Sequence, residues 1–465
     1  MNGKKLYIRS FGCQMNKLDS GLVTRAFTFA GCELVDDEGD ADIIIFNTCS
    51  VREKAEQKVL SRIGYAGHLK KDRPDIVVAV IGCMAQRLGD KLLENPAVDI
   101  VCGPGRIPTL PQQVRQVMQQ HGHLVSVEDD IRKIPEAQAQ QMLDEFEYIN
   151  DSDEGQIRGQ AFIRVMRGCN NFCSYCIVPF VRGPEVSRPP AQIIEQARKL
   201  AGTGVRQLTL LGQTVNSYFY DDGGRKWRLS DILEAVSQIS GIERIRFITS
   251  YPHLDYDEPL FHAMADIDEV CPYLHMPAQS GSDRVLKAMN RKYTVGQYLE
   301  TLDKARDIVS GITIASDFIV GFPGESEDDF EKTVNLVQKA RYKNIFAFKY
   351  SPRPGTKTET RMADDVPEEI KKIRVNKLLK IQEDISRQDN AALVGTRMKV
   401  LVEGPSKKAH LNNADHQKYP QLISRSAGDH IVVFNGPEIL SGKFARVEIK
   451  KASALTLFGE YSEGS

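Results

Sequence analysis

Three cysteines lie close together in the middle of the sequence. Cys169, Cys173 and Cys176 form the pattern Cys-x3-Cys-x2-Cys, directly after a predicted β-strand, Ala161 to Met166. Three thiolates on one loop can hold three irons of a cubane iron–sulfur cluster and leave the fourth iron open to a ligand from outside the protein. A zinc site is the alternative, but structural zinc usually takes four protein ligands, and no further Cys or His follows at zinc-finger spacing. The loop therefore predicts a cluster with an open iron.

A second group of cysteines lies in the first quarter of the chain. Cys13, Cys49, Cys83 and Cys102 each stand at or just after the end of a predicted strand. In a parallel sheet such ends meet at one edge, where α/β proteins bind ligands. Three of these cysteines could hold a second cluster, and the pattern leaves four candidates, with buried inert thiols as the alternative. Cys32 precedes a strand and should lie at the opposite edge.

The elements that position these cysteines form two alternating series. Over residues 4–120 apolar runs alternate with amphipathic stretches, which predicts an α/β domain with a parallel sheet. An acidic linker is predicted over 121–154, because residues 126–155 hold ten acidic and two basic residues, a net charge of −8. The strands predicted in the first domain are Lys5 to Ser10, Asp42 to Asn47, Asp75 to Ile81 and Val98 to Val101.

The second series, over residues 155–387, contains six predicted strands separated by helical patterns. Six units of a strand followed by a helix are typical of a complete or partial (β/α) barrel, whose reactive groups lie at the C-terminal ends of the strands. The Cys169 loop follows the first strand. The predicted strands are Ala161 to Met166, Gln207 to Leu211, Arg244 to Ile248, Tyr273 to Met276, Ile312 to Val320 and Asn344 to Tyr350.

The end of the chain differs in composition. Residues 388–454 contain short β-branched runs separated by Gly, Pro and Asn, which predicts a small all-β barrel. Across 395–451 there are ten basic and five acidic residues, a net charge of +5, whereas the whole chain carries −1. RNA binding is therefore predicted here, with a solvated surface as the alternative. The basic residues predicted to contact RNA include Lys399, Lys407, Lys408, Arg425, Lys443 and Arg446.

Composition limits the cellular setting. The 465 residues, 41% of them hydrophobic, predict two to four folded domains. Nine cysteines without an export signal favour metal binding over disulfides. The longest apolar runs have the length of strands and not of membrane spans. We therefore expect a cytoplasmic protein with no membrane partner.

Motifs along the whole chain resemble those of the methylthiotransferase family of radical S-adenosylmethionine (SAM) enzymes. The motifs are FGCQMN, NTCSVREKAE, VIGCMAQR, MRGCNNFCSYCIVPFVRG, LLGQTVNSY and SDFIVGFPGE, and the C-terminal barrel is similar to a TRAM domain. The resemblance implies two [4Fe–4S] clusters, with SAM on the open iron of the Cys169 loop. It also implies that Cys13, Cys49 and Cys83 hold the auxiliary cluster and that Cys32 and Cys102 are structural.

The resemblance further implies an activity. It is greatest to the members that add a methylthio group to C2 of N(6)-isopentenyladenosine (dimethylallyladenosine) next to the anticodon of tRNA. These use two SAM molecules, sulfur from the auxiliary cluster and an electron donor, flavodoxin-like or similar, and need no catalytic residue beyond the cluster ligands. The alternatives are methylthiolation of threonylcarbamoyladenosine in tRNA or of a ribosomal-protein aspartate and, outside enzymes, an iron–sulfur electron carrier or scaffold. The partner predicted is thus a tRNA anticodon stem-loop.

Several residues at predicted strand ends are expected to contact SAM. Gly212 and Gln213 follow the second strand of the barrel, Gln279 follows the fourth, and Ser316 lies on the fifth. Tyr175, the aromatic residue before the last cysteine, lies beside the adenine of SAM in the radical SAM signature that this loop resembles. These five residues make up the predicted SAM site.

Overall fold

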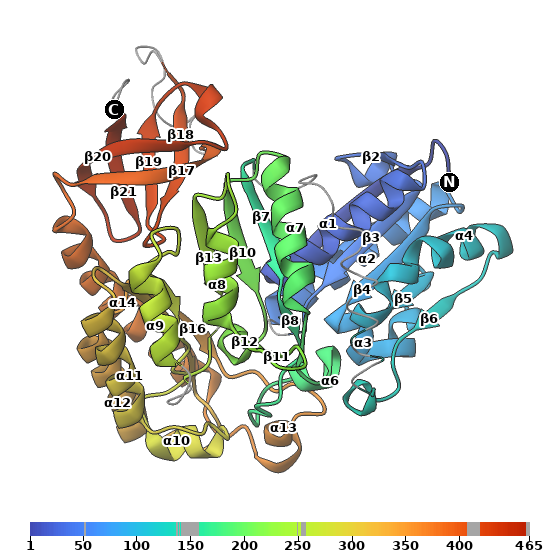
Figure 1. The fold of residues 1–465 in the computed structure, drawn as a ribbon. Helices are drawn as coiled ribbons and strands as arrows, with labels where there is room; N and C mark the ends of the chain where they lie inside the picture. Colours follow the sequence, from blue (N-terminus) through green and yellow to red (C-terminus); the bar gives the residue numbers. More distant parts are fainter. Residues whose placement is uncertain are drawn as a thin grey trace.

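The computed structural model describes residues 1–50, 53–135, 138, 140, 158–248, 250–252, 257–406 and 419–461. It contains an N-terminal α/β sheet, a central partial barrel and a C-terminal β-barrel, in that order along the chain (Figure 1). Half of the predicted acidic linker, residues 121–135 with 138 and 140, is described, and the other half falls outside the described residues. Its strand Leu124–Ser126 pairs with the N-terminal sheet, so that domain extends beyond the predicted residue 120. No helix in the described ranges combines the length and the apolar character needed to cross a membrane.

The N-terminal domain is a parallel sheet of six strands in the order β2-β1-β3-β4-β5-β6. Its strands are apolar on both faces, as expected for a parallel sheet covered by helices on both sides. All four predicted strands are present, and the short β2 and β6 were not predicted. The strands are β1 (Lys5–Phe11), β2 (Glu33–Leu34), β3 (Ile43–Thr48), β4 (Val77–Gly82), β5 (Ile100–Cys102) and β6 (Leu124–Ser126).

Helices cover both faces of this sheet. α1 (Gln14–Phe29) and α4 (Leu110–Gln120) pack on one face, and α2 (Glu53–Asp72) and α3 (Cys83–Leu88) pack on the other. Leu211 of the central barrel belongs to the same apolar cluster as Leu18 of α1. The N-terminal domain thus packs directly against the barrel, with α1 at the junction.

The central domain is a partial barrel of six parallel strands. Two three-stranded sheets, β13-β10-β7 and β14-β15-β16, are joined by a bridge between Ile245 and Val270. All six predicted strands are present. They are β7 (Gln160–Arg164), β10 (Gln207–Leu211), β13 (Arg244–Ile248), β14 (Tyr273–His275), β15 (Thr313–Val320) and β16 (Asn344–Lys349). Two short ladders join β8 (Met166–Arg167) to β9 (Val186–Ser187) and β11 (Phe219–Asp221) to β12 (Lys226–Arg228).

The helices between the strands pack outside the barrel and form the largest apolar core with them (Figure 1). They are α7 (Pro190–Gly202), α8 (Leu229–Ser237), α9 (Asp257–Asp266), α11 (Val295–Ile308), α12 (Glu327–Ala340) and α14 (Glu368–Ala391). Shorter helices lie at the strand ends: α6 (Val178–Arg182), α10 (Asp283–Ala288) and α13 (Lys357–Arg361).

The C-terminal domain is a closed five-stranded barrel in the order β17-β18-β19-β21-β20. It docks on the N-terminal ends of the central strands, where Arg244, the first residue of β13, donates to the Arg425 carbonyl at 2.9 Å. Similarly, the hydroxyl of Thr313, the first residue of β15, donates to the Gly428 carbonyl at 2.8 Å. The strands are β17 (Arg397–Pro405), β18 (Gln421–Ser426), β19 (Ile431–Asn435), β20 (Phe444–Ala452) and β21 (Thr456–Tyr461), the last of which lies beyond the predicted domain end at residue 454.

Candidate metal centres

Cys13, Cys49 and Cys83 gather at one edge of the N-terminal sheet. They follow β1, β3 and β4, which are neighbours in the sheet. The register places the last residues of these strands in a single row: Phe11, Thr48 and Gly82. Each cysteine therefore stands one or two residues beyond the same row.

Two glycines allow these strand ends to approach each other. A Cβ on Gly12 would come within 2.9 Å of the Cβ of Cys49. Gly82 has a φ of +94°, and a Cβ there would lie 2.6 Å from the carbonyl oxygen of Thr48. Any larger residue would strain the backbone or push the strand ends apart, so the sequence around the cysteines favours their convergence.

Cys102 and Cys32 are separated from this group. Cys102 is the last residue of β5 and pairs with Ile81, so it lies within the ladder and not beyond it. Its thiol is packed in the apolar core, and burial raises its pKa to about 12. Cys32 precedes β2, whose Glu33 pairs with the first residue of β1, so Cys32 lies at the opposite edge, as predicted. Of the four candidates, the structure thus brings three together.

A buried ion network connects this edge to the central barrel. Arg182, the last residue of α6, donates from Nε to the sulfur of Cys83 at 3.3 Å and from Nη2 to Oδ2 of Asp19 at 3.1 Å. Arg164, at the end of β7, pairs with the other oxygen of Asp19. All three charged side chains are at most 7% exposed. Because α6 begins two residues after Cys176, one short helix links both groups of cysteines.

The charges at this junction act on one another. Burial raises the pKa of the Cys83 thiol, and the neighbouring Arg182 opposes that effect. Burial alone would lower the pKa of Arg182, but the charges of Cys83 and Asp19 raise it above its ordinary value. The guanidinium therefore remains a cation beside Cys83, where it stabilises a thiolate of the kind that binds metal.

The second group occupies the loop between β8 and α6. Cys169, Cys173 and Cys176 are partly exposed. The amide of Asn171 donates to the sulfur of Cys169 at 3.5 Å, and Nη1 of Arg291 donates to the sulfur of Cys173 at 3.4 Å. Donors directed at sulfur suit the thiolates of an iron–sulfur cluster. This donor set fits a cluster on the loop.

The three sulfurs of the loop also influence one another. Burial raises the pKa values of Cys169 and Cys176, and the nearby Cys173 raises both further. Metal binding would displace these protons, which makes the affinity dependent on pH. Within the described ranges, no three His, Cys, Asp or Glu side chains stand close enough to hold a single metal ion.

Three of the predicted SAM residues lie on the rim around this loop. Tyr175 packs edge-on against Phe322, with ring centroids 6.5 Å apart and an angle of 80°. Gly212 and Gln213 follow β10, and the next residue, Thr214, places its hydroxyl oxygen 3.4 Å from the sulfur of Cys169. Oε1 of Gln213 is buried and has no hydrogen-bond partner among the described residues. It is therefore available to a ligand.

The other two predicted SAM residues have internal roles. Gln279 has a φ of +71°, and its N–H donates to the Asp317 carbonyl, which extends the pairing with β15. Ser316 is fully buried; its hydroxyl donates to the Met276 carbonyl at 3.1 Å and accepts from the Ala278 N–H at 2.9 Å. The Ser316 hydroxyl is thus already occupied by the backbone.

The predicted RNA contacts differ in how exposed they are. Lys399 and Arg425 are held in ion pairs with acidic neighbours at 2.9 and 3.1 Å, so their charges are partly neutralised. Lys443 and Arg446 lie exposed on or beside β20. The remaining two, Lys407 and Lys408, lie outside the described residues.

Sequence reasoning missed the charged residues that link the two groups. Asp19 could have been noticed, because it stands on the apolar side of α1 between Leu18 and Leu22, where an unpaired charge would be costly. Its partners Arg164 and Arg182 are about 150 residues away, and no local pattern marks them. Arg291 likewise approaches Cys173 only through the fold.

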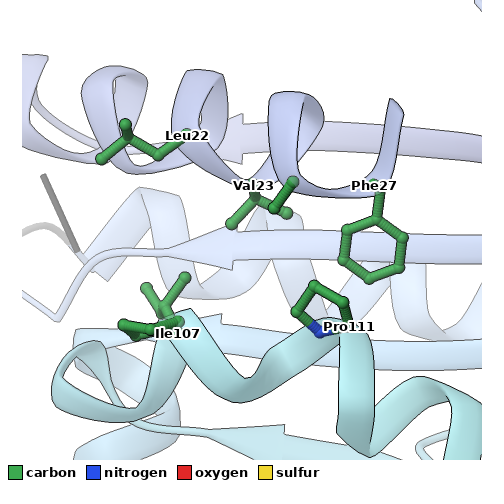
Figure 2. Close-up of a pocket in the computed structure, with 7 residues that line it drawn as sticks. Leu22, Val23, Phe27, Ile107 and Pro111 are labelled. Carbon is green, nitrogen blue, oxygen red and sulfur yellow. The ribbon is translucent and has the colours of Figure 1, made fainter. Parts of the chain in front are cut away.

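A small apolar pocket lies elsewhere in the N-terminal domain. It opens between α1 and the 3-10 turn Pro104–Thr109 that leads into α4 (Figure 2). Its lining consists of Leu22, Val23, Ala26, Phe27, Ile107, Pro108 and Pro111. These side chains offer neither metal ligands nor acids or bases, so the chemistry lies with the cysteine groups.

Comparison with known families defines the class of protein. Residues 5–103 match the Uncharacterized protein family UPF0004, residues 163–337 match the Radical SAM superfamily, and residues 391–461 match the TRAM domain. The fold and the two cysteine groups therefore define a radical SAM protein with an added domain at each end.

Relatives along the whole chain narrow this class. The chain is 40% identical over 457 residues to tRNA-2-methylthio-N(6)-dimethylallyladenosine synthase of Rhodopirellula baltica, which covers 98% of this chain and 95% of that one. It is also 40% identical to the protein of that name in Moorella thermoacetica, over 99% of both chains. The chain belongs to the family of these synthases, as its motifs predicted.

A solved structure resembles the fold at low sequence identity. The radical S-adenosylmethionine methyltransferase TsrM from Kitasatospora setae, with cobalamin and a [4Fe-4S] cluster bound, has a TM-score of 0.53. The alignment covers 77% of both chains at 12% identity. This likeness concerns the fold alone.

Proposed function

We propose that the chain is a radical SAM tRNA methylthiotransferase that adds a methylthio group to C2 of N(6)-isopentenyladenosine next to the anticodon. The observation that carries this proposal is the pair of cysteine groups joined through α6, with Arg182 in contact with Cys83. Full-length relatives bearing the name of this activity support the substrate. The threonylcarbamoyladenosine, ribosomal-aspartate and electron-carrier alternatives are not favoured.

Cys169, Cys173 and Cys176 would hold the [4Fe–4S] cluster whose open iron binds SAM. When bound, this cluster supplies the electron that cleaves SAM to a radical able to attack an unactivated aromatic C–H bond. The chain's own groups act around it. Arg291 and Asn171 donate to the sulfurs, and Tyr175, Gly212 and Gln213 lie on the rim where SAM would bind. Gln279, whose backbone pairs with β15, remains a predicted contact. The internal bonds of Ser316 make it the weakest member of the predicted SAM set.

Cys13, Cys49 and Cys83 would hold the auxiliary cluster that provides the sulfur. Asn16 lies 3.3 Å from the sulfur of Cys13, and Arg182 donates to that of Cys83, so both sulfurs have polar neighbours. With two SAM molecules consumed per product, one for the methyl group and one for the radical, the two clusters must serve one substrate. The direct link between their domains supports this.

The C-terminal barrel would bind the anticodon stem-loop. Lys443 and Arg446 are the residues of this barrel that are best placed to contact phosphates. Removing either charge should reduce the slope of log binding constant against log salt concentration by about one. An electron donor, flavodoxin-like or similar, would reduce the Cys169 cluster. Because the substrate is tRNA, we place the reaction in the cytoplasm.

The experiment that tests this function uses reconstituted protein with SAM, reductant and isopentenylated tRNA. We expect about eight irons per chain, as two cubanes require, and methylthio-isopentenyladenosine in the digested tRNA by mass spectrometry. Transfer of the group to threonylcarbamoyladenosine tRNA or to a ribosomal peptide instead would show that one of the alternatives is correct.

A further inference from the structure

The inner face of the partial barrel carries polar and aromatic side chains that its packing does not explain. Phe318 of β15 and Ile345 of β16 point outward and belong to the core shared with the helices. Side chains alternate along a strand, so Asp317 and Phe346 point inward. By the same alternation His275 of β14 points inward, since Leu274 belongs to the outer core.

These three inward side chains form one unit. Asp317 and Phe346 are direct partners in the register between β15 and β16. Nε2 of His275 lies 3.3 Å from Oδ1 of Asp317. The His275 ring also packs edge-on against Phe346, with centroids 6.3 Å apart and an angle of 77°. The carboxylate and the phenyl ring are therefore held in fixed relation to each other.

Both groups remain accessible. Phe346 is 46% exposed, and the side chain of Asp317 is 26% exposed. β16 is the outer strand of its sheet, so the ring stands beside the open side of the partial barrel. An exposed aromatic ring next to a partly exposed carboxylate offers a stacking surface and a hydrogen-bond acceptor.

The unit lies between the RNA-binding barrel and the Cys169 loop. Toward the N-terminal strand ends, Arg246 bonds Asp429 of the C-terminal barrel at 3.2 Å and helps close that end. Toward the C-terminal ends, Ile319, two residues beyond Asp317 on the same face, packs against the apolar cluster that also contacts Tyr175. A base entering from the open side would thus meet Phe346 and Asp317 below the loop.

We propose that Phe346 and Asp317 form the subsite for the target base, an inference that rests on the function proposed above. Phe346 stacks on the adenine, and Asp317 accepts the one N–H that an N(6)-alkylated adenine retains. His275 is a positioning residue that orients the carboxylate. Bases outside a helix are recognised through such stacking and edge contacts. A base with a carbonyl at C6 would place an acceptor against the carboxylate and be rejected.

The test compares two RNAs on the reconstituted protein by fluorescence anisotropy: an anticodon stem-loop with isopentenyladenosine and one with an abasic site at that position. The wild type should bind the first more tightly. Phe346→Ala should reduce this advantage roughly tenfold, while binding of the abasic RNA stays unchanged. Phe346→Tyr should keep the advantage, because the phenol retains a stacking face.

A second variant tests the acceptor. Asp317→Leu should lose the preference for adenosine over inosine in the same stem-loop, a pair without the isopentenyl group that differs in the amino or carbonyl group at C6 and in the N1 proton. Asp317→Asn, which keeps one acceptor oxygen, should retain part of it. Phe29→Ala is the matched control, since this ring is 76% exposed on the N-terminal domain. The Phe29→Ala variant should bind all of these RNAs as tightly as the wild type does.

The subsite is wrong if Phe346→Ala weakens both RNAs equally, weakens neither, or if the wild type shows no preference for the base over the abasic site. These outcomes differ from failure of the proposed function. In that case the wild type would form no methylthio-isopentenyladenosine, whereas a wrong subsite would leave product formation by the wild type intact.

Discussion

The two cysteine groups are built in opposite ways. Cys169, Cys173 and Cys176 lie within eight residues on one partly exposed loop. Cys13, Cys49 and Cys83 come from three strands spread over 71 residues, and two of them are buried. The first group depends on one loop, and the second depends on the register of a whole sheet.

This difference predicts how metal binding by each cysteine group responds to substitutions. Nearby ligands on a single loop lose little chain entropy when they bind metal, whereas distant ligands must first be brought together by folding. The sheet group also receives a hydrogen bond from another domain, through Arg182. We therefore expect the sheet group to be sensitive to distant changes and the loop group to be sensitive mainly to its own residues.

Replacing a loop cysteine should have the largest effect. Cys169→Ala removes one of the three proposed cluster ligands, and deoxyadenosine formation from SAM should fall by more than about 100-fold, which is more than the loss of a residue that only supports a ligand costs. About four irons should remain on the sheet group. Chromatography of deoxyadenosine together with iron analysis measures both. Persistent SAM cleavage would mean that the radical does not originate at this loop.

A change in the sheet group should separate the two chemistries. Cys49→Ala should leave SAM cleavage nearly intact but abolish the methylthio product, because only the sulfur-supplying cluster is lost. Cys102→Ala is the matched control: it removes a buried thiol from the core at a cost of roughly 1–2 kcal/mol and should keep both clusters. Loss of SAM cleavage in Cys49→Ala would contradict this division of labour.

The link between domains should matter only for the sheet group. Arg182→Ala leaves Asp19 with a single partner, and breaking a buried ion pair of this kind costs roughly 3 kcal/mol. We expect lower stability in urea and loss of iron from the sheet group, with SAM cleavage largely kept. Arg182→Lys should recover part of the stability, since it keeps the charge but not the forked geometry.

A control residue checks that the Arg182 effect is specific. Arg225 stacks on Trp227 at 3.8 Å with its side chain 60% exposed, so Arg225→Ala should change neither stability nor iron content noticeably. If Arg182→Ala removed iron equally from both groups, the contrast between loop and sheet would fail.

The sequence predicted the loop group better than the sheet group, because the loop cysteines are close in the sequence whereas the sheet cysteines are brought together only by the pairing of distant strands. The spacing of Cys169, Cys173 and Cys176 is local and visible in ten residues. For the sheet group, the strand pattern narrowed the candidates but could not separate Cys102 from the others. That choice depends on β5 pairing, which places Cys102 inside the ladder, and register across strands is not encoded locally.

The strands were predicted where an apolar run marks them. The six barrel strands and four strands of the first domain have clear apolar runs, although β5 and β14 span only three residues each. The two-residue β2 was missed because it carries no period, β6 because it lies inside the predicted acidic linker, and β21 because it lies beyond the predicted end of the last domain. The contacts of Arg182 with Asp19 and Cys83 join distant segments and could not be predicted from either one.

The smallest predicted effect concerns a hydrogen bond inside the loop group. Asn171→Ala removes the donor to the Cys169 sulfur. In the proposed cluster, this hydrogen bond would stabilise the more negative, reduced state. The reduction potential should fall by roughly 40 mV, the one-electron equivalent of a hydrogen bond of about 1 kcal/mol. Iron content should not change, because the three ligands remain on one loop.

The neighbouring asparagine provides the control. The side chain of Asn170 accepts from the Glu185 N–H at 3.1 Å and is not bonded to a cysteine sulfur, so Asn170→Ala should leave the potential unchanged. Potentiometric titration followed by electron paramagnetic resonance measures both variants. If Asn171→Ala lost iron as readily as Arg182→Ala, the loop group would depend on the side chains that donate to its sulfurs as strongly as the sheet group does. Retained iron with a shifted potential would instead show that the spacing of the three cysteines is enough to hold the metal. The hydrogen-bond donors would then serve only to adjust the reduction potential of the cluster.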